Sequence, residues 1–390
     1  MGMIGGSTRL PDLSAVDDVR SILIVRLKAL GDIVLSFPIV TALRKRFPEA
    51  DLMYLCREQY AETLSGDTDL DEVIVLPENL SEQVSLLKKL RRRRIDLVLD
   101  LLGSPRSALI TLATGARIRI GMDVGRHRWC YHYLLPRVVI RSGRRTKCYT
   151  LESNNEIVRM LNLWKESGGE GETASRSPGR SVSPGGEARR LKEEELEIGF
   201  PAAEGEMEWA QEYINGLGVE QSKLIGIAPG VTYQSKSWPL EHFIELVRIL
   251  KEEYDVTPIV LWGPGEQRMA ERIVKSVPGV VMAPETGIAQ LGALIALLSL
   301  LVTSDSGPKH LAVIQGVPTV TLFGPTDPCV WNPQTAKHHA VYLALSCSPC
   351  RKRECEPNLC LTGIEPGIVA NAVADMLHLR SRTGKAVTER

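Results

Sequence analysis

Short apolar runs alternate with amphipathic stretches along most of the chain. Residues 21–27 are almost continuously apolar, which is typical of a parallel strand covered on both faces, and a helical pattern follows to about residue 47. Further runs of strand length occur at residues 51–56, 73–76 and 95–102. This alternation predicts an α/β fold built on parallel strands.

The same alternation begins again in the second half. Strands are expected at residues 224–228, 258–262 and 319–323, and a helix ending in a buried strand at residues 294–302. Pro239 stands at the start of a helix that is expected to continue through Glu253. Because 390 residues are many for a single core, the chain is expected to form two domains.

The two halves are separated by a segment that cannot form a core. Residues 166–190 consist mainly of Gly, Ser, Pro, Glu and Arg, so we expect disorder or a surface insertion there. The expected organisation is a loose leader at 1–18, an N-terminal domain at 19–163, an insert and linker at 164–200, a C-terminal domain at 201–364, and a last helix and tail at 365–390.

Charge is unevenly distributed although the formal net charge is zero. Residues 19–163 hold 24 Lys and Arg against 16 Asp and Glu, whereas residues 164–390 hold 22 against 28. The basic half predicts an anionic partner, although a solvated helix face explains the run Arg91–Arg94 equally well. Aromatic residues make up 5% and do not interleave with the basic ones, so nucleic-acid binding is not expected. No secretory or membrane-spanning pattern occurs, and we expect a cytoplasmic protein.

The most informative stretch is Asp305-Ser306-Gly307-Pro308-Lys309-His310, after the apolar run. Pro308 favours a new helix here, and the following strand ends in Gly-Pro-Thr-Asp-Pro at residues 324–328. Two strand ends and one helix N-terminus thereby gather hydroxyls, backbone N–H groups and His310, an arrangement that suits an anionic ligand. The alternative is an ordinary turn in which Asp or Ser caps the helix and His310 lies in solvent.

Two other strand ends carry polar candidates. Thr232 and Lys236 follow the strand at 224–228, and a hydroxyl and an ammonium ahead of a helix start suit a diphosphate. Asp32 follows the first strand, where open α/β sheets place their ligands; as a plain N-cap it would contribute about 1 kcal/mol. No Gly-x-Gly-x-x-Gly fingerprint is present at this turn, which disfavours a nicotinamide cofactor.

Four cysteines are concentrated near the C-terminus, namely Cys347, Cys350, Cys355 and Cys360. A tetrahedral zinc site needs no more than four thiolates, but this spacing is more compact than that of the usual paired knuckles. Structural thiols or disulfides are the alternative, and a cytosolic location disfavours stable disulfides. Catalysis through these cysteines is not expected.

Three of these motifs resemble glycosyltransferase family 9, the bacterial heptosyltransferases of lipopolysaccharide core synthesis. They are Arg-Leu-x-Ala-x-Gly-Asp at 26–32, Lys-x-Trp-Pro at 236–239 and the double element at 305–328. The resemblance covers about residues 20–375 outside the insert. It implies a GT-B fold, with two Rossmann-like domains facing a central cleft.

The resemblance also implies an activity and a set of site residues. The expected reaction is inverting, metal-independent transfer of a heptose or related sugar from a nucleotide-diphosphate donor, ADP-heptose above all, with Asp32 as the catalytic base. Donor-binding residues would be Thr232, Lys236, Glu266, Asp305, Ser306, Gly307 and His310. Arg106 and Arg126 would contact the acceptor. Family members often have Gln in the turn where this chain has Leu102, which removes one expected acceptor contact.

The expected partners follow from that reaction. They are the nucleotide-sugar donor and an anionic glycan or glycolipid acceptor, with peripheral contact at the inner face of the cytoplasmic membrane and no required cofactor. The alternatives are a GT-B enzyme with another donor sugar, or a non-catalytic nucleotide-sugar-binding protein with a decayed site. Intact Asp32 and Lys236 favour the enzyme.

Overall fold

A computed structural model describes residues 18–135, 139–141, 144–146, 149–161, 197–200, 205–350 and 352–379. The predicted leader (except Asp18), the insert up to residue 196 and the tail from residue 380 lie outside the described residues. By its internal contacts the chain divides into two units, residues 1–190 and 191–390.

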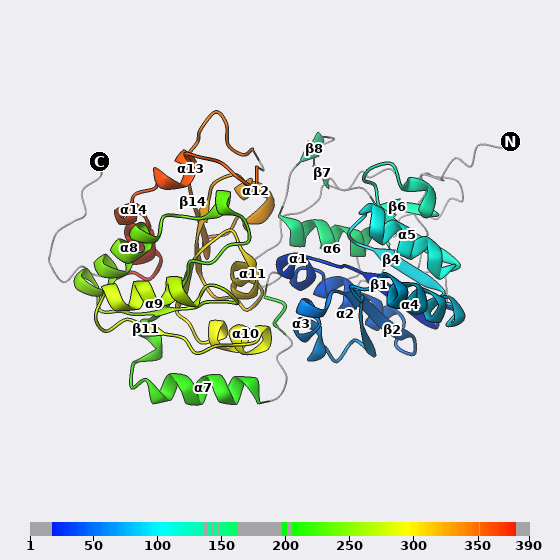
Figure 1. Cartoon of the computed structure of the whole chain (residues 1–390), viewed down its shortest axis with the longest axis horizontal. Helices are drawn as coiled ribbons and strands as arrows, with labels where there is room; N and C mark the ends of the chain where they lie inside the picture. Colours follow the sequence, from blue (N-terminus) through cyan, green and yellow to red (C-terminus); the bar gives the residue numbers. More distant parts are fainter. Residues whose placement is uncertain are drawn as a thin grey trace, which may run out of the picture. The chain divides into compact units, whose positions relative to one another are not determined.

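The first unit is built on a six-stranded parallel sheet (Figure 1). Its strands follow the order β3-β2-β1-β4-β5-β6, which is the Rossmann order. They are β1 (Ser21–Val25), β2 (Asp51–Cys56), β3 (Glu72–Val75), β4 (Leu97–Asp100), β5 (Ile118–Met122) and β6 (Tyr133–Leu135). A small antiparallel pair, β7 (Val139–Arg141) and β8 (Arg144–Thr146), follows.

Helices cover this sheet and exclude water from its central strand. They are α1 (Leu30–Val34), α2 (Phe37–Arg46), α3 (Glu62–Ser65), α4 (Leu80–Arg92), α5 (Pro105–Thr114) and α6 (Thr150–Met160). Helix α2 packs against α6, and α4 packs against α5. Leu23 and Val25 of β1 share a core with Leu90 and Ile110 of α4 and α5. Because the residues of β1 from Ile22 to Val25 are all inaccessible to solvent, the near-continuous apolar run is explained.

One predicted helix is divided in two. The sequence pattern predicts a single helix to about residue 47, whereas α1 ends at Val34 and α2 begins at Phe37. Pro38 has no backbone N–H to donate to the carbonyl of Val34, so the helical ladder cannot continue through it. Ser36 occupies the break and places its hydroxyl 2.7 Å from the carbonyl oxygen of Ile33 and 2.8 Å from the Tyr54 hydroxyl.

The second unit repeats the architecture (Figure 1). Its six parallel strands have the order β11-β10-β9-β12-β13-β14. They are β9 (Leu224–Ala228), β10 (Thr257–Val260), β11 (Val281–Met282), β12 (Leu300–Ser304), β13 (Thr319–Phe323) and β14 (His338–Tyr342). The helices are α7 (Glu206–Gly216), α8 (Leu240–Glu253), α9 (Gln267–Ser276), α10 (Ile288–Ala296), α11 (Gly307–Ile314), α12 (Pro328–Trp331), α13 (Leu359–Thr362) and α14 (Pro366–Met376).

Both sheets reverse their strand order at one place, between β1 and β4 and between β9 and β12. In open α/β sheets the carboxyl ends of the strands at such a reversal form the ligand-binding crevice. The predicted α/β class with two Rossmann-like domains is confirmed. Among the described helices, none combines the length and apolar character needed to cross a bilayer.

Candidate functional site

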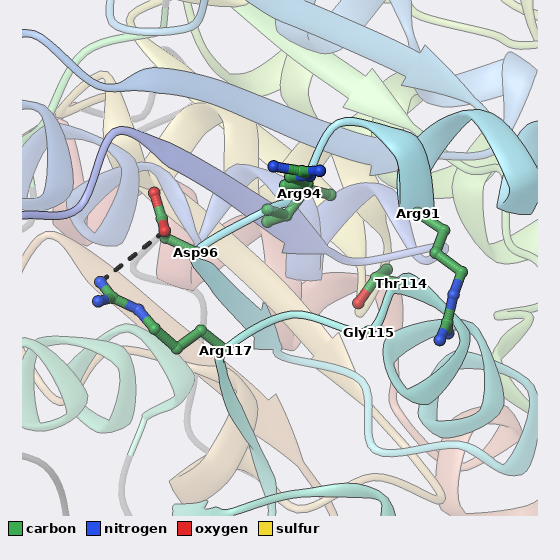
Figure 2. Close-up of a pocket in the computed structure, with 7 residues that line it drawn as sticks. Arg91, Arg94, Asp96, Thr114, Gly115 and Arg117 are labelled. Atoms are coloured by element: carbon green, nitrogen blue, oxygen red, sulfur yellow. Dashed lines mark ion pairs between the residues drawn. The ribbon is translucent and has the colours of Figure 1, made fainter.

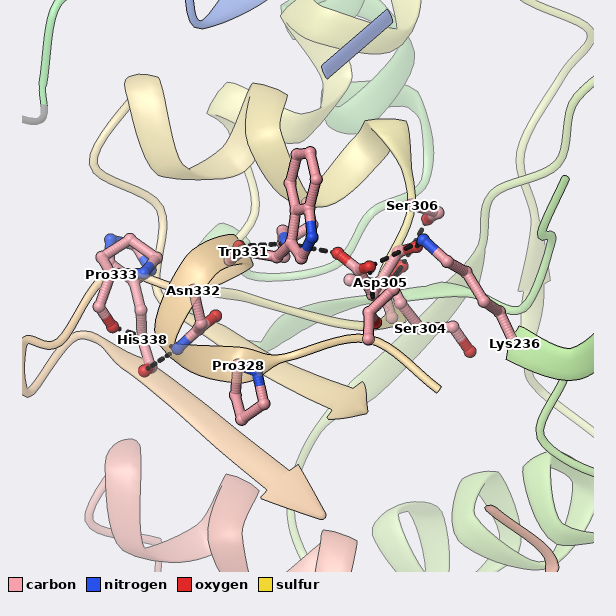
Figure 3. A network of polar contacts seen from close by, with 12 residues as sticks. Lys236, Ser304, Asp305, Ser306, Pro328, Trp331, Asn332, Pro333 and His338 are labelled. Atoms are coloured by element: carbon pink, nitrogen blue, oxygen red, sulfur yellow. Dashed lines mark hydrogen bonds and ion pairs between the residues drawn. The ribbon is translucent and has the colours of Figure 1, made fainter. Parts of the chain in front are cut away.

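Lys236 and Asp305 meet at the strand-order reversal of the second unit. Lys236 ends a short 3-10 turn, Gln234–Lys236, that follows β9, and Asp305 comes directly after β12. The Lys236 ammonium donates to the Asp305 carboxylate at 2.7 Å and to the Asp305 carbonyl oxygen at 3.0 Å (Figure 3). Lys236 is 21% exposed and Asp305 only 4%. The structure therefore joins two residues that lie 69 positions apart in the sequence.

The Asp305 carboxylate accepts hydrogen bonds from three protein donors. Besides Lys236, it accepts from the Lys309 ammonium at 2.7 Å on Oδ1 and from the Thr326 hydroxyl at 2.8 Å on Oδ2. Burial alone would raise the pKa of Asp305, but the ammoniums of Lys309 and Lys236 hold this pKa well below its usual range. Asp305 is thus an anion that binds and orients cations.

Lys309 is a functional candidate that the sequence reasoning missed. Its side chain is completely buried, and its ammonium also donates to the carbonyl oxygen of Trp331 and lies 5.1 Å from the ring centroid of Phe323. Burial lowers the pKa of Lys309, while Asp305 opposes that shift. The available signal was its position four residues after Asp305, the spacing at which side chains meet on a helix.

His310 lies inside the unit, so the solvent-exposed reading of this residue is wrong. It is 4% exposed and meets Trp331 edge-on, with ring centroids 6.2 Å apart. Burial, and then the charge of Lys309, lower the pKa of His310 well below 6.5. The imidazole is therefore neutral at pH 7 and can take part in hydrogen bonds without carrying charge.

Ser306 and Gly307 form the start of α11. Ser306 is the N-cap residue, but its side chain makes no capping bond and lies 3.2 Å from the Thr303 hydroxyl instead. Pro308 stands in the first turn, as the sequence predicted. The N-terminal backbone N–H groups of this helix thus begin next to Asp305, at the carboxyl end of β12.

Thr232 and Glu266 take different positions around the neighbouring strand ends. Glu266 is the N-cap residue of α9, and its carboxylate accepts from the backbone N–H of Gly263 at 2.9 Å. A Cβ atom on Gly230 would collide with this carboxylate, so Glu266 lies against the turn that follows β9. Thr232 is exposed, and the described contacts do not bring it into the Lys236 network.

The cysteine-rich segment, residues 347–360, supports the turn that carries Lys236. Ser235 donates through its backbone N–H to the Arg353 carbonyl at 3.2 Å and through its hydroxyl to the Lys352 carbonyl at 2.6 Å. Asn358 donates to the carbonyl of Ser235 at 2.9 Å. These contacts fix the backbone next to Lys236.

The four thiols of this segment show no metal-binding arrangement. Cys360 is buried, Cys350 and Cys355 are half-buried, and Cys347 is exposed. The Cys360 thiol donates to the Asn358 side-chain oxygen at 3.1 Å, and burial raises the pKa of Cys360. In the described part of the chain, no three His, Cys, Asp or Glu side chains converge as metal ligands would. The choice between structural thiols and a zinc site stays a prediction.

Asp32 lies at the strand-order reversal of the first unit. Its carboxylate is 2.6 Å from the guanidinium of Arg26, the residue that follows β1. It is the third residue of α1 and accepts from the backbone N–H of Ala29, the N-cap, at 3.4 Å. The plain N-cap reading of Asp32 is therefore wrong. Arg26 was not predicted, although it belongs to the same sequence motif.

The predicted acceptor residues also lie at the carboxyl ends of the strands of this sheet. Arg106 is exposed in the first turn of α5, after β4, and Arg126 is exposed in the loop after β5. The turn at Leu102 is stabilised by hydrogen bonds to the buried side chain of Asp100. Its carboxylate accepts from the backbone N–H groups of Leu102 and Gly103 at 2.9 and 3.0 Å, and from the Tyr131 hydroxyl at 2.6 Å.

The basic run at residues 91–94 contributes to a separate pocket of about 320 Å³. Figure 2 shows Arg91, Arg94 and Arg117 around it. Arg117 pairs with Asp18 at 2.6 Å and with Asp96 at 3.8 Å. Residues 95–96 precede β4 and residues 114–117 precede β5, so the pocket lies at the amino ends of the strands. Asp32 lies at their carboxyl ends.

Comparisons with known proteins show which family and fold the chain is similar to. The sequence pattern of glycosyltransferase family 9 (heptosyltransferase) matches residues 83–360, well over half of the chain. Lipooligosaccharide heptosyltransferase 2 of Campylobacter jejuni is 29% identical over 168 residues, which cover 40% of this chain and 51% of that relative. The chain thus spans about half the length of this relative. Lipopolysaccharide heptosyltransferase 1 of Pseudomonas aeruginosa is 22% identical over 385 residues, 91% of this chain and 98% of the relative.

A solved structure supports the fold independently. The ADP-heptose lps heptosyltransferase II of Escherichia coli matches with a TM-score of 0.65 at 22% identity, over 92% of this chain and 98% of that one. The predicted GT-B fold class is confirmed by this likeness and by the two sheets of Rossmann order. On the strength of the match at residues 83–360, the chain belongs to glycosyltransferase family 9, the heptosyltransferases.

Proposed function

We propose that this chain transfers a heptose from ADP-heptose to a hydroxyl group of a lipopolysaccharide core acceptor, with inversion at the anomeric carbon. The observation that carries the proposal is Lys236, a partly exposed side chain whose ammonium is held at the strand-order reversal of the second unit by Asp305. The donor and the acceptor class are taken from the E. coli protein of the same fold, which is described as an ADP-heptose lps heptosyltransferase. A diphosphate is the part of that donor which such a cation would bind.

In this mechanism Asp32 is the general base. Its carboxylate accepts the proton of the acceptor hydroxyl while that oxygen attacks the anomeric carbon from the face opposite to the diphosphate. A bond forms between the acceptor oxygen and the anomeric carbon, the bond from that carbon to the diphosphate oxygen breaks, and ADP leaves with the electron pair. Arg26 holds the carboxylate in place, which makes it a positioning residue.

The second unit stabilises the leaving group. Negative charge grows on the diphosphate as the glycosidic bond breaks, and Lys236 together with the N–H groups at Ser306 and Gly307 would bind it. Neutral His310 would contribute a hydrogen bond rather than a charge. Thr232 would contact the same phosphates and Glu266 the ribose hydroxyls.

Asp305 has a different part from the direct donor contact that the sequence suggested. Its two carboxylate oxygens already accept from Lys236, Lys309 and Thr326, and a carboxylate would repel a diphosphate. We therefore assign it a positioning role, through Lys236.

The acceptor side rests on the basic first unit. Arg106 and Arg126 would bind anionic groups of the acceptor. The acceptor would be a glycolipid, which the protein reaches by peripheral contact with the inner face of the cytoplasmic membrane. Cationic side chains supply the charge compensation in this scheme, so a divalent ion is not required for departure of ADP. Turnover with a chelator present would support this point.

The test is donor binding and turnover in Lys236→Met. Loss of a charge-assisted contact worth about 1.5–3 kcal/mol should weaken ADP binding about 10- to 150-fold in calorimetry. Lys223→Met, which removes a half-buried surface lysine of the same unit, is the matched control and should bind ADP like the wild type. Mass spectrometry of the product identifies the transferred sugar. Unchanged ADP affinity in Lys236→Met, or a wild-type preference for UDP, would contradict the proposal.

A further inference from the structure

We propose that buried Lys309 neutralises Asp305 and thereby leaves Lys236 its full positive charge for the donor diphosphate. This inference rests on the function proposed above and adds a residue to it. Lys309 makes no direct contact with the donor in this scheme, because its side chain has no solvent-exposed surface. It acts through Asp305, as a positioning residue.

The charges of the three side chains carry the argument. Lys236 and Asp305 alone would form a neutral pair, and a neutral pair attracts a diphosphate weakly. Lys309 adds a second ammonium at 2.7 Å from the same carboxylate, so the group of three has a net charge of +1. Adjacent His310 does not change this sum at pH 7, because burial keeps it neutral.

The hydrogen bonds divide the carboxylate between the two lysines. Oδ1 accepts from Lys309, and Oδ2 accepts from Lys236 and Thr326. Lys236 uses two of its three N–H donors on Asp305, at 2.7 and 3.0 Å. An ammonium has three N–H donors and the Lys236 side chain is 21% exposed, so in this scheme the third N–H binds a phosphate oxygen. Lys309, by contrast, directs its ammonium to Asp305 and to the Trp331 carbonyl inside the unit.

A purely structural ion pair is the competing explanation. Lys309 links α11 to the end of α12 through Trp331, and such a link could serve folding alone. Burying an ammonium is costly, however, and replacing a buried ion pair by apolar groups is often neutral or stabilising. The stability of the folded protein therefore gives little reason for a lysine at position 309. A positive charge that serves donor binding explains it better.

A charge cycle distinguishes the two explanations. Lys309→Met lowers the charge of the group from +1 to 0 and should weaken ADP binding about tenfold, with a shallower dependence on salt. The double variant Lys309→Met, Asp305→Asn removes one positive and one negative charge and restores +1. It should bind ADP several-fold more tightly than Lys309→Met, although less tightly than the wild type because Asp305 no longer positions Lys236, and its salt dependence should return to that of the wild type.

Each outcome decides between the proposals. If Lys236→Met binds ADP normally, the proposed function fails. If Lys236→Met binds ADP weakly but Lys309→Met binds ADP normally, the inference about Lys309 is overturned while the proposed function stands. If the double variant binds as weakly as Lys309→Met, the role of Lys309 is structural. Thermal denaturation shows whether Lys309→Met folds; if it does not, the folded double variant still carries the test, and a salt dependence shallower than that of the wild type overturns the inference.

Discussion

The guanidinium of Arg26 lies 2.6 Å from the carboxylate of Asp32, at the point where β1 ends. Arg26 also donates to the carbonyl oxygen of Leu101, which follows the neighbouring strand β4. The candidate base is therefore tied to both strands of the order reversal, through a side chain that is only 14% exposed. This link determines how the carboxylate is oriented.

Asp32→Asn should abolish transfer and leave ADP binding nearly unchanged. The replacement is isosteric, but an amide cannot accept the proton of the attacking hydroxyl. Asp32 also belongs to the unit that does not carry the Lys236 network. Single-turnover assays at saturating donor, together with calorimetry for ADP, check both parts. Turnover close to that of the wild type would remove Asp32 from the mechanism.

Arg26→Met should lower kcat by about 10- to 100-fold, less than Asp32→Asn, and should leave the KM for the donor unchanged. The carboxylate remains present but loses the partner that orients it. Arg20→Met, at an exposed residue just before β1, is the matched control and should keep full activity. A rise in donor KM without a change in kcat would argue against orientation of the base.

The sequence was informative where the local pattern decides the structure. Apolar runs such as residues 51–56 become strands because burial on both faces needs continuous apolar side chains, and Pro308 opens α11 because its missing N–H costs nothing in the first turn. Contacts between distant segments could not be predicted in this way. The bond from Thr326 to Asp305 depends on the register of β12 and β13, and the role of Arg26 depends on the place of β4 beside β1.

The cysteine-rich segment should behave as a set of structural thiols. Elemental analysis should find no stoichiometric zinc, and a strong chelator should leave both Tm and turnover unchanged. About one zinc per chain, together with a lower Tm after chelation, would reverse this reading.

Single replacements in this segment should differ with burial. Cys360→Ser should destabilise the protein by about 1 kcal/mol, because the hydroxyl is more polar than the thiol in a core that Cys360 shares with Leu361, even if it keeps the hydrogen bond to Asn358. Cys347→Ser, at an exposed position, is the control and should change stability by less than about 0.5 kcal/mol. Urea denaturation of both variants measures the difference. Equal effects would indicate that the segment is more open than the structure shows.

His338 should make the folded state sensitive to acid. Its side chain is 4% exposed and lies 3.1 Å from the Thr319 hydroxyl, and burial lowers the pKa of His338 to about 3. In the unfolded chain the pKa returns to about 6.5. Between these values the unfolded state binds more protons than the folded state, so stability rises with pH. It is lost as the pH falls below 6.5, by up to about 1.4 kcal/mol per pH unit for this side chain.

His338→Gln should remove this share of the acid sensitivity. The variant loses stability at pH 7, but its free energy of unfolding should fall less steeply than that of the wild type between pH 6 and 4. His310 keeps its own contribution, since its pKa is depressed by burial in the same direction. His339→Gln, at the exposed neighbouring position of β14, is the control and should retain the wild-type slope. Parallel pH profiles for His338→Gln and the wild type would contradict this prediction. They would show that His338 has the same pKa in the folded and the unfolded state, so that its protonation is not what destabilises the protein in acid.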